Sequence, residues 1–182
     1  MLVIDEPSLL WLLILGLVVA FAGLVHGTLG LGFPLVATPI VAAMFDVPTA
    51  ILMTLLPTVT VNVARIATAT GYKDSLRRFW PLVVAAFIGS IGGTWLLVHT
   101  EPEPFRLLLG LLIVLFLWST LANRLPRSAF AAYPVAAMVV FGVGGGFSAG
   151  TTNVMVAVLI IYFLTIDLAR PTMVPIMNTC FL

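Results

Sequence analysis

The sequence predicts an all-α, polytopic integral membrane protein with two inverted repeats, whose helices are broken at glycines. Its composition, the spacing of its charges and one repeated pattern support this fold class. Of the 182 residues, 62% are hydrophobic and 8% are charged, against about 25% charged residues in an average soluble domain. At about 20 apolar residues per membrane-spanning helix, the chain is long enough for seven or eight segments. The composition excludes a water-soluble monomer and makes the lipid bilayer the expected partner.

The charge balance narrows the possible functions further. The formal net charge is +1, so the chain offers neither a basic surface for nucleic acid nor a polybasic lipid anchor. Cys180 is the only cysteine, which excludes an intrachain disulfide framework and a multi-cysteine metal site. No metal and no organic cofactor is indicated. We therefore expect the functional residues to lie within the bilayer.

Two uncharged runs of equal length indicate an internal repeat. Residues 7–45 and 128–166 each span 39 positions without Asp, Glu, Lys or Arg. Asp46 and Asp167 close the two runs and lie 121 positions apart, and each run has a glycine-rich break near its middle. A repeat of this length predicts a duplicated architecture.

The repeat divides the chain into a first transmembrane repeat at 1–122 and the start of a second, incomplete one at 123–182, so we expect a longer parent protein. Each uncharged run is too long for one pass and fits two helices joined at the break. The segments at 31–45 and 151–166 are short enough to be half-helices that enter the membrane without crossing it. In chain order, the predicted segments are 8–26, 31–45, 48–69, 79–98, 105–122, 129–147, 151–166 and one from 169.

Local signals justify these segments in turn. The first follows Asp5 and Glu6 and lacks the basic start of a signal peptide, so we expect it to be retained. Pro34 suits the first turn of the second, and Asp46 suits a cap or boundary before the third. Basic loops precede the fourth and sixth segments, and the loop before the fifth is acidic. These basic residues are Lys73, Arg77 and Arg78, then Arg124 and Arg127.

The charged loops also predict the orientation. Basic loops are cytoplasmic by the positive-inside rule, and counting segments from them places the N-terminus outside. Five segments per repeat then invert the second repeat relative to the first. Inverted repeats with glycine-broken helices are typical of secondary transporters that bind their substrate near the membrane midplane.

The first break gives four predicted substrate-binding residues: Gly27, Thr28, Gly30 and Gly32. Glycine lets the backbone unwind and approach a ligand. A helix N-terminus within the membrane attracts an anion such as a carboxylate or sulfonate through its free N–H groups and dipole. The alternative is that these glycines only allow helices to pack closely.

The matching stretch in the second repeat adds five candidates: Ser148, Gly150, Thr151, Thr152 and Asn153. Their hydroxyl and amide groups are expected where a second half-helix begins, so that two helix N-termini would enclose one anion. The alternative is that the hydroxyls only bond the carbonyl one turn back in their own helix.

The third segment contributes two further candidates, Asn62 and Arg65, which share one helical face with Thr58. An arginine within the membrane indicates a functional site, although its side chain can instead extend to the headgroups. His26, beside the first break, is a possible proton relay or a hydrogen-bonded residue of a helix interface.

One pattern typical of enzymes occurs around Ser148, where residues 146–150 read G-x-S-x-G. That motif needs a strand-to-helix turn followed by an acid and then a histidine. Only Asp167 follows as an acid, and both histidines, His26 and His99, precede the motif. An intramembrane serine hydrolase is therefore the weaker alternative, and the chain is not expected to be an enzyme.

With these residues in view, the chain resembles the sulfite exporter TauE/SafE family of membrane permeases, also called TSUP, over essentially its whole length. Three stretches carry the resemblance: the first glycine break with Pro34, the basic loop that leads to Gly89, Gly92 and Gly93, and the run from Gly146 to Asn153 followed by Ile161 and Tyr162.

The resemblance implies a multi-pass transporter of the inner membrane with two inverted repeats. It also implies a substrate among the small sulfur-containing anions, such as sulfite, thiosulfate or organosulfonates. A passive anion channel is the alternative within the same architecture, and no cofactor is implied.

Overall fold

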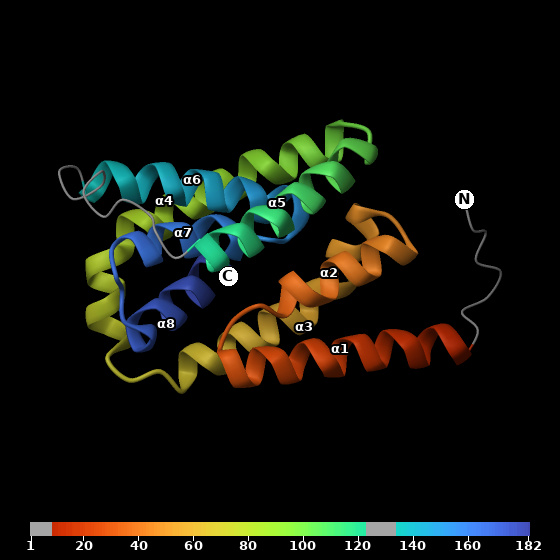
Figure 1. Ribbon diagram of the computed structural model, residues 1–182, viewed down its shortest axis with the longest axis horizontal. Helices are drawn as coiled ribbons and strands as arrows, with labels where there is room; N and C mark the ends of the chain where they lie inside the picture. The colour runs from red at the N-terminus through yellow and green to blue at the C-terminus, as the bar shows by residue number, and fades with distance from the viewer. Residues whose placement is uncertain (1–8, 123–133) are drawn as a thin grey trace.

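The computed structural model describes residues 9–122 and 134–182, and within these ranges the regular structure is entirely helical. The helices are α1 (Leu9–Leu29), α2 (Phe33–Met44), α3 (Val47–Ala67), α4 (Tyr72–His99), α5 (Glu103–Ala122), α6 (Pro134–Thr152), α7 (Val156–Thr165) and α8 (Arg170–Cys180). Apart from α5 and α6, between which residues 123–133 are not described, consecutive helices are joined by two to four residues (Figure 1).

The predicted all-α fold class of a polytopic membrane protein is confirmed. Each predicted segment corresponds to one helix. In the described part of the chain, four helices are long and apolar enough to cross a membrane, namely Trp11–Leu29, Val47–Ala67, Tyr72–His99 and Pro134–Thr152. The predicted cytoplasmic loop with Arg124 and Arg127, the start of the 129–147 segment and the first eight residues lie outside the described residues.

The first predicted helix break lies where the glycines indicate. Gly30 and Gly32 have φ angles of 80° and 98°, a region that residues with a side chain rarely adopt. They separate α1 from α2, and Pro34 then occupies the first turn of α2, where its missing N–H costs no hydrogen bond. The two glycines therefore create an interior helix N-terminus.

The third helix begins at the predicted boundary residue. Asp46 is the N-cap of α3, and its carboxylate accepts a hydrogen bond of 2.7 Å from the Thr49 N–H. Asp167, its counterpart in the second run, lies between α7 and α8 with a φ of 54°. α6 runs in the opposite direction to α1 (Figure 1).

The second predicted break is misplaced in the sequence analysis. α6 continues through all of its glycines to Thr152, and the chain leaves the helix only at Asn153, which has a φ of 59°. Ser148, Thr151 and Thr152 therefore lie in the last turns of α6 and not at the start of a new helix. α7 begins beyond them, at Val156.

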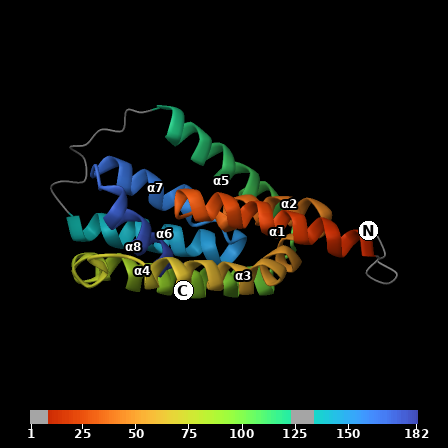
Figure 2. The same ribbon diagram turned by 90° about the horizontal axis from the view of Figure 1, so that it is seen from below.

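The glycines of α6 do not break the helix because they form its contact with α4. A Cβ atom at Gly142, Gly146 or Gly150 would collide with main-chain atoms of α4, whereas the first side-chain atom near a Cβ at Gly144 lies 3.7 Å away. Gly89 and Gly93 of α4 approach main-chain atoms of α6 in the same way. The two helices run side by side in the same direction (Figures 1 and 2), so main-chain contact offsets the low helix propensity of glycine.

α4 begins seven residues before the predicted segment and bends at its predicted start. Phe79 has non-helical angles (φ −107°, ψ 15°), and Pro81 follows two residues later. The proline ring clashes with the carbonyl four residues before it and removes one helical donor, which kinks the helix. The basic residues 73, 77 and 78, predicted to lie in a loop, are therefore in the first part of α4.

Three hydrophobic clusters within the described residues hold the remaining helices around this pair. The largest joins α4 and α6 to α7 and α8 and includes Phe79, Leu159, Tyr162 and Phe163. A second joins α2, α3, α5 and α7 to the end of α4, and a third, smaller one joins α1 to α2. Many large apolar side chains on the outer faces of α1, α4 and α5 are exposed, as expected for helices that face lipid.

Candidate functional site

A small polar cavity lies at the break between α1 and α2. About 170 Å³ of space lies between the atoms of its lining, but no part of this space is wide enough for a water-sized sphere. Residues from α1, α2, α3 and α8 and from the break itself line it: His26, Leu31, Gly32, Pro34, Asn62, Met177, Asn178 and Phe181.

Three buried polar side chains in this cavity carry atoms that have no hydrogen-bond partner among the described residues. His26, Asn62 and Asn178 are 4%, 1% and 2% exposed. The atoms without a partner are both ring nitrogens of His26, Nδ2 of Asn62 and Oδ1 of Asn178. A buried polar atom without a partner costs about 1–3 kcal/mol, so this cluster is unfavourable for folding unless a ligand pairs with it.

Asn178 connects α8 to the backbone of the break. Its Nδ2 donates to the carbonyl oxygens of Gly30 at 2.8 Å and Val174 at 2.7 Å. The Gly30 N–H in turn donates to the carbonyl oxygen of His26 at 2.6 Å. The amide of Asn178 therefore holds the broken backbone in place and leaves its oxygen unpartnered.

Arg65 brings a positive charge to the edge of this cavity. Its guanidinium packs against Gly30, where an added Cβ would lie 2.9 Å from both Nε and Nη2. The side chain is half-buried, and no acidic residue in the described ranges forms an ion pair with it. The absence of a side chain at Gly30 is what lets the guanidinium reach the break.

The structure thus brings together five of the predicted site residues, namely Gly30, Gly32, Asn62, Arg65 and His26. Two others from the first break lie elsewhere. Gly27 and Thr28 are exposed, and the Thr28 hydroxyl donates to the carbonyls of Leu24 and Val25 in its own helix. Residues 27 and 28 belong to the last turn of α1, and they face away from the cavity.

Sequence reasoning missed Asn178. Its only signal was an uncharged polar residue in the otherwise apolar stretch 173–178, and no pairing with the first break is readable from that. The contact joins residues 148 positions apart, so only the packing of α8 against α3 and the break reveals it.

The second break forms a separate polar contact. Nδ2 of Asn153 lies 3.3 Å from Oγ1 of Thr38 and 3.2 Å from Oγ1 of Thr54. These two hydroxyls are 3.4 Å apart. Asn153 therefore ties the α6–α7 break to α2 and α3.

The two breaks lie against the same helix at different heights. Thr54, Thr58 and Asn62 are buried on one face of α3, and the second break contacts Thr54 whereas the first adjoins Asn62. Eight residues of helix span about 12 Å. The prediction that two helix N-termini enclose one common anion site is therefore wrong: the two breaks form separate polar contacts.

The other predicted residues of the second repeat have local partners. Ser148 Oγ donates to the Gly144 carbonyl at 2.9 Å, Thr151 Oγ1 to that of Phe147 at 2.8 Å and Thr152 Oγ1 to that of Ser148 at 2.8 Å. Gly150 packs against the backbone of α4. Ser148 lies inside a continuous helix, so the G-x-S-x-G sequence lacks the strand-to-helix turn that a nucleophile elbow requires.

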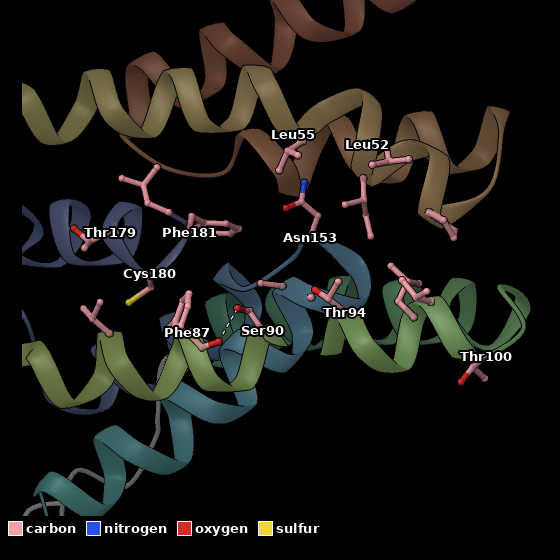
Figure 3. Close-up of a pocket in the computed structure, with 18 of the residues that line it drawn as sticks. Leu52, Leu55, Phe87, Ser90, Thr94, Thr100, Asn153, Thr179, Cys180 and Phe181 are labelled. Atoms are coloured by element: carbon pink, nitrogen blue, oxygen red, sulfur yellow. Dashed lines mark hydrogen bonds between the residues drawn. The ribbon is translucent and has the colours of Figure 1, made fainter. Parts of the chain in front are cut away.

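A larger pocket of about 820 Å³ lies between α3, α4, α6 and the end of α8 (Figure 3). Its lining is mostly apolar and contains no charged side chain. The polar groups there include Ser90, whose hydroxyl donates to the Phe87 carbonyl at 2.8 Å, and Asn153, which reaches toward α3. Phe181 borders both this pocket and the polar cavity. The larger pocket offers an anion no charge, so the polar cavity is the candidate site.

A bundle that contains membrane-length apolar helices and an interior helix break defines the chain as a polytopic membrane protein. The family model described as sulfite exporter TauE/SafE matches residues 15–182. The chain belongs to this family of membrane transporters. No curated protein and no solved structure shows a significant match.

Proposed function

We infer that this chain is a carrier for small sulfur-containing anions, such as sulfite, thiosulfate or organosulfonates, and that it binds them in the polar cavity at the α1–α2 break. The observation that carries this proposal is the cluster of unpartnered polar atoms on His26, Asn62 and Asn178 beside the Arg65 guanidinium. Family membership supports the substrate class.

The chemistry of the cavity suits an anion. The first turn of α2 contributes a helix N-terminus, whose free N–H groups and dipole favour negative charge. Asn62 adds an amide donor, and Arg65 adds a full positive charge at the edge. His26 has both ring nitrogens available and remains our candidate for a proton relay.

We further propose that the protein spans the inner membrane several times with its N-terminus outside, and that the regions 1–122 and 123–182 belong to inverted repeats. The basic residues at the start of α4 support this orientation. In alternating access, the cavity would open first toward one side and then toward the other. Because no water-sized sphere fits in it here, its side chains must move apart before an anion enters.

Counterflow in liposomes that contain the full-length protein tests the proposal. Labelled sulfite is exchanged against thiosulfate, an organosulfonate, sulfate and acetate in turn. Saturable exchange inhibited by a sulfur anion, and not by acetate, is the expected result. Flux without saturation or counterflow would favour a passive channel, and no flux with any anion would contradict the proposed function.

Three variants connect transport to the cavity. Asn62→Ala removes a donor to a charged ligand, worth about 1.5–3 kcal/mol, and is expected to weaken apparent affinity by about ten- to hundredfold. Thr60→Ala is the control, because Thr60 is exposed on the same helix and its hydroxyl only bonds the Leu56 carbonyl.

Arg65→Lys keeps the charge but loses the planar guanidinium. Unaltered affinity for the anion would show that the Arg65 side chain merely extends toward the headgroups.

A further inference from the structure

On the proposed function, the Asn178 amide presents a buried hydrogen-bond acceptor to the bound anion. The orientation of its amide is fixed, since a flipped amide would place Oδ1 against the carbonyl oxygens of Gly30 and Val174, which lie 2.8 and 2.7 Å from Nδ2. Oδ1 can only accept hydrogen bonds, and it has no partner within the described residues. A ligand without a hydrogen-bond donor would therefore bring a negative charge against this buried oxygen.

The remaining groups of the cavity are a mixture of donors and acceptors. Asn62 presents its Nδ2, and the imidazole of His26, when neutral, has one donor nitrogen and one acceptor nitrogen. A fully deprotonated oxyanion would use only the donors. An oxyanion that retains one proton can pair with both kinds of group.

The charge at the cavity points to the same conclusion. Among the elements that enclose it, α1 contributes His26 and α3 contributes Arg65, whereas α2 has no ionisable side chain. On α8, Arg170 is exposed and Cys180 lines the larger pocket. One fixed positive charge balances one negative charge, and a second negative charge would be buried without a partner, which is costly.

We propose that the cavity binds a small oxyanion in its singly charged, protonated form, so that hydrogensulfite is the bound species and not the sulfite dianion. Its hydroxyl donates to Oδ1 of Asn178, and another of its oxygens accepts from Nδ2 of Asn62, beside the Arg65 guanidinium. Each transport event then moves one proton together with the anion.

Equilibrium dialysis of the purified chain in detergent against labelled sulfite, at pH values on both sides of the pKa of hydrogensulfite, tests this proposal. If only the protonated form binds, the apparent affinity for total sulfite falls about tenfold per pH unit above that pKa. Methanesulfonate, a monoanion without a donor, is expected to bind about tenfold or more weakly. Its binding is expected to show no pH dependence over the same range.

The outcomes separate this inference from the proposed function. Equal affinity for methanesulfonate and hydrogensulfite, or sulfite binding that does not change with pH, would overturn the inference and leave the anion site standing. Methanesulfonate binding that weakens with rising pH would assign the proton to the protein, with His26 as its carrier, and would also overturn it. No saturable binding of any anion would contradict the proposed function itself.

A pair of neighbouring variants tests the role of Asn178. Asn178→Ala removes the acceptor, so the preference for hydrogensulfite over methanesulfonate is expected to fall to about one. Thr179→Ala is the control, because the Thr179 hydroxyl bonds the Tyr72 hydroxyl and the Pro175 carbonyl outside the cavity, and it should retain the preference. A preference retained in Asn178→Ala would overturn the inference, and the comparison of ligands on the unaltered chain decides it if that variant does not fold.

Discussion

Gly30→Ala tests whether the backbone at the first break positions the Arg65 guanidinium. The added Cβ would lie 2.8 Å from Val174 Cγ1 and 2.9 Å from Nε and Nη2 of Arg65, at a residue whose φ is 80°. The left-handed backbone costs about 1–2 kcal/mol for a residue with a side chain, and crowding in a packed site adds about 1–3 kcal/mol. We therefore expect a loss of about 2–5 kcal/mol in the free energy of unfolding.

Gly71→Ala is the matched control for backbone strain. Gly71 has a φ of 66°, and nothing lies within 4 Å of an added Cβ, so only the cost of the left-handed backbone, about 1–2 kcal/mol, applies. Denaturant titration in detergent measures the free energy of unfolding for both variants, and dialysis against labelled sulfite measures binding. Gly30→Ala should also lose sulfite affinity, because the guanidinium must move, whereas Gly71→Ala should keep it. Equal stability and equal affinity in the two variants would refute the assigned role of Gly30.

Four further substitutions address the second half of the chain. Gly146→Ala should lower the free energy of unfolding by about 3 kcal/mol or more, because the added Cβ would overlap the Ala86 carbonyl. Gly144→Ala is its control: no atom lies nearer than 3.7 Å to an added Cβ, so the free energy of unfolding should change by no more than about 1 kcal/mol. Equal melting temperatures for the two variants would contradict the backbone contact. Ser148→Ala should leave sulfite exchange unchanged, since its hydroxyl bonds only its own helix, and an activated fluorophosphonate should not label the parent chain. Asn153→Ala should cost about 1–3 kcal/mol in unfolding free energy, because the amide bonds two buried threonines; an unchanged denaturation midpoint would contradict this.

The positions of the helices were predictable because charge and hydropathy alone determine them in a membrane protein. The uncharged runs, the glycines at 30 and 32 and the cap at Asp46 each act locally, so a sequence is sufficient to find them. The proximity of the residues around the first break was predictable for the same reason, since Asn62 and Arg65 share a helix face and His26 is one turn before Gly30.

The second break was not predictable from its glycines. Glycine can either break a helix or let two helices pack closely through their main chains. The sequence alone does not distinguish these two roles, because the distinction depends on whether a partner helix lies against the glycine. The four-residue spacing of Gly142, Gly146 and Gly150 is the signal that favours contact, and Asn153 ends the helix instead. Asn178 was missed for a related reason, since its partner Gly30 lies 148 positions away in the sequence.

The contact between α4 and α6 also has a consequence for divergence within the family. At five glycines, the separation of the two helix axes is determined by main-chain atoms and not by side chains. A homologous chain with a larger residue at any of these positions must hold the axes further apart, and α7 and α8, which pack on the same pair, must move outward with them. For a relative of unknown structure, the residues at these five positions therefore indicate whether the axes of the two helices lie as close together as they do here.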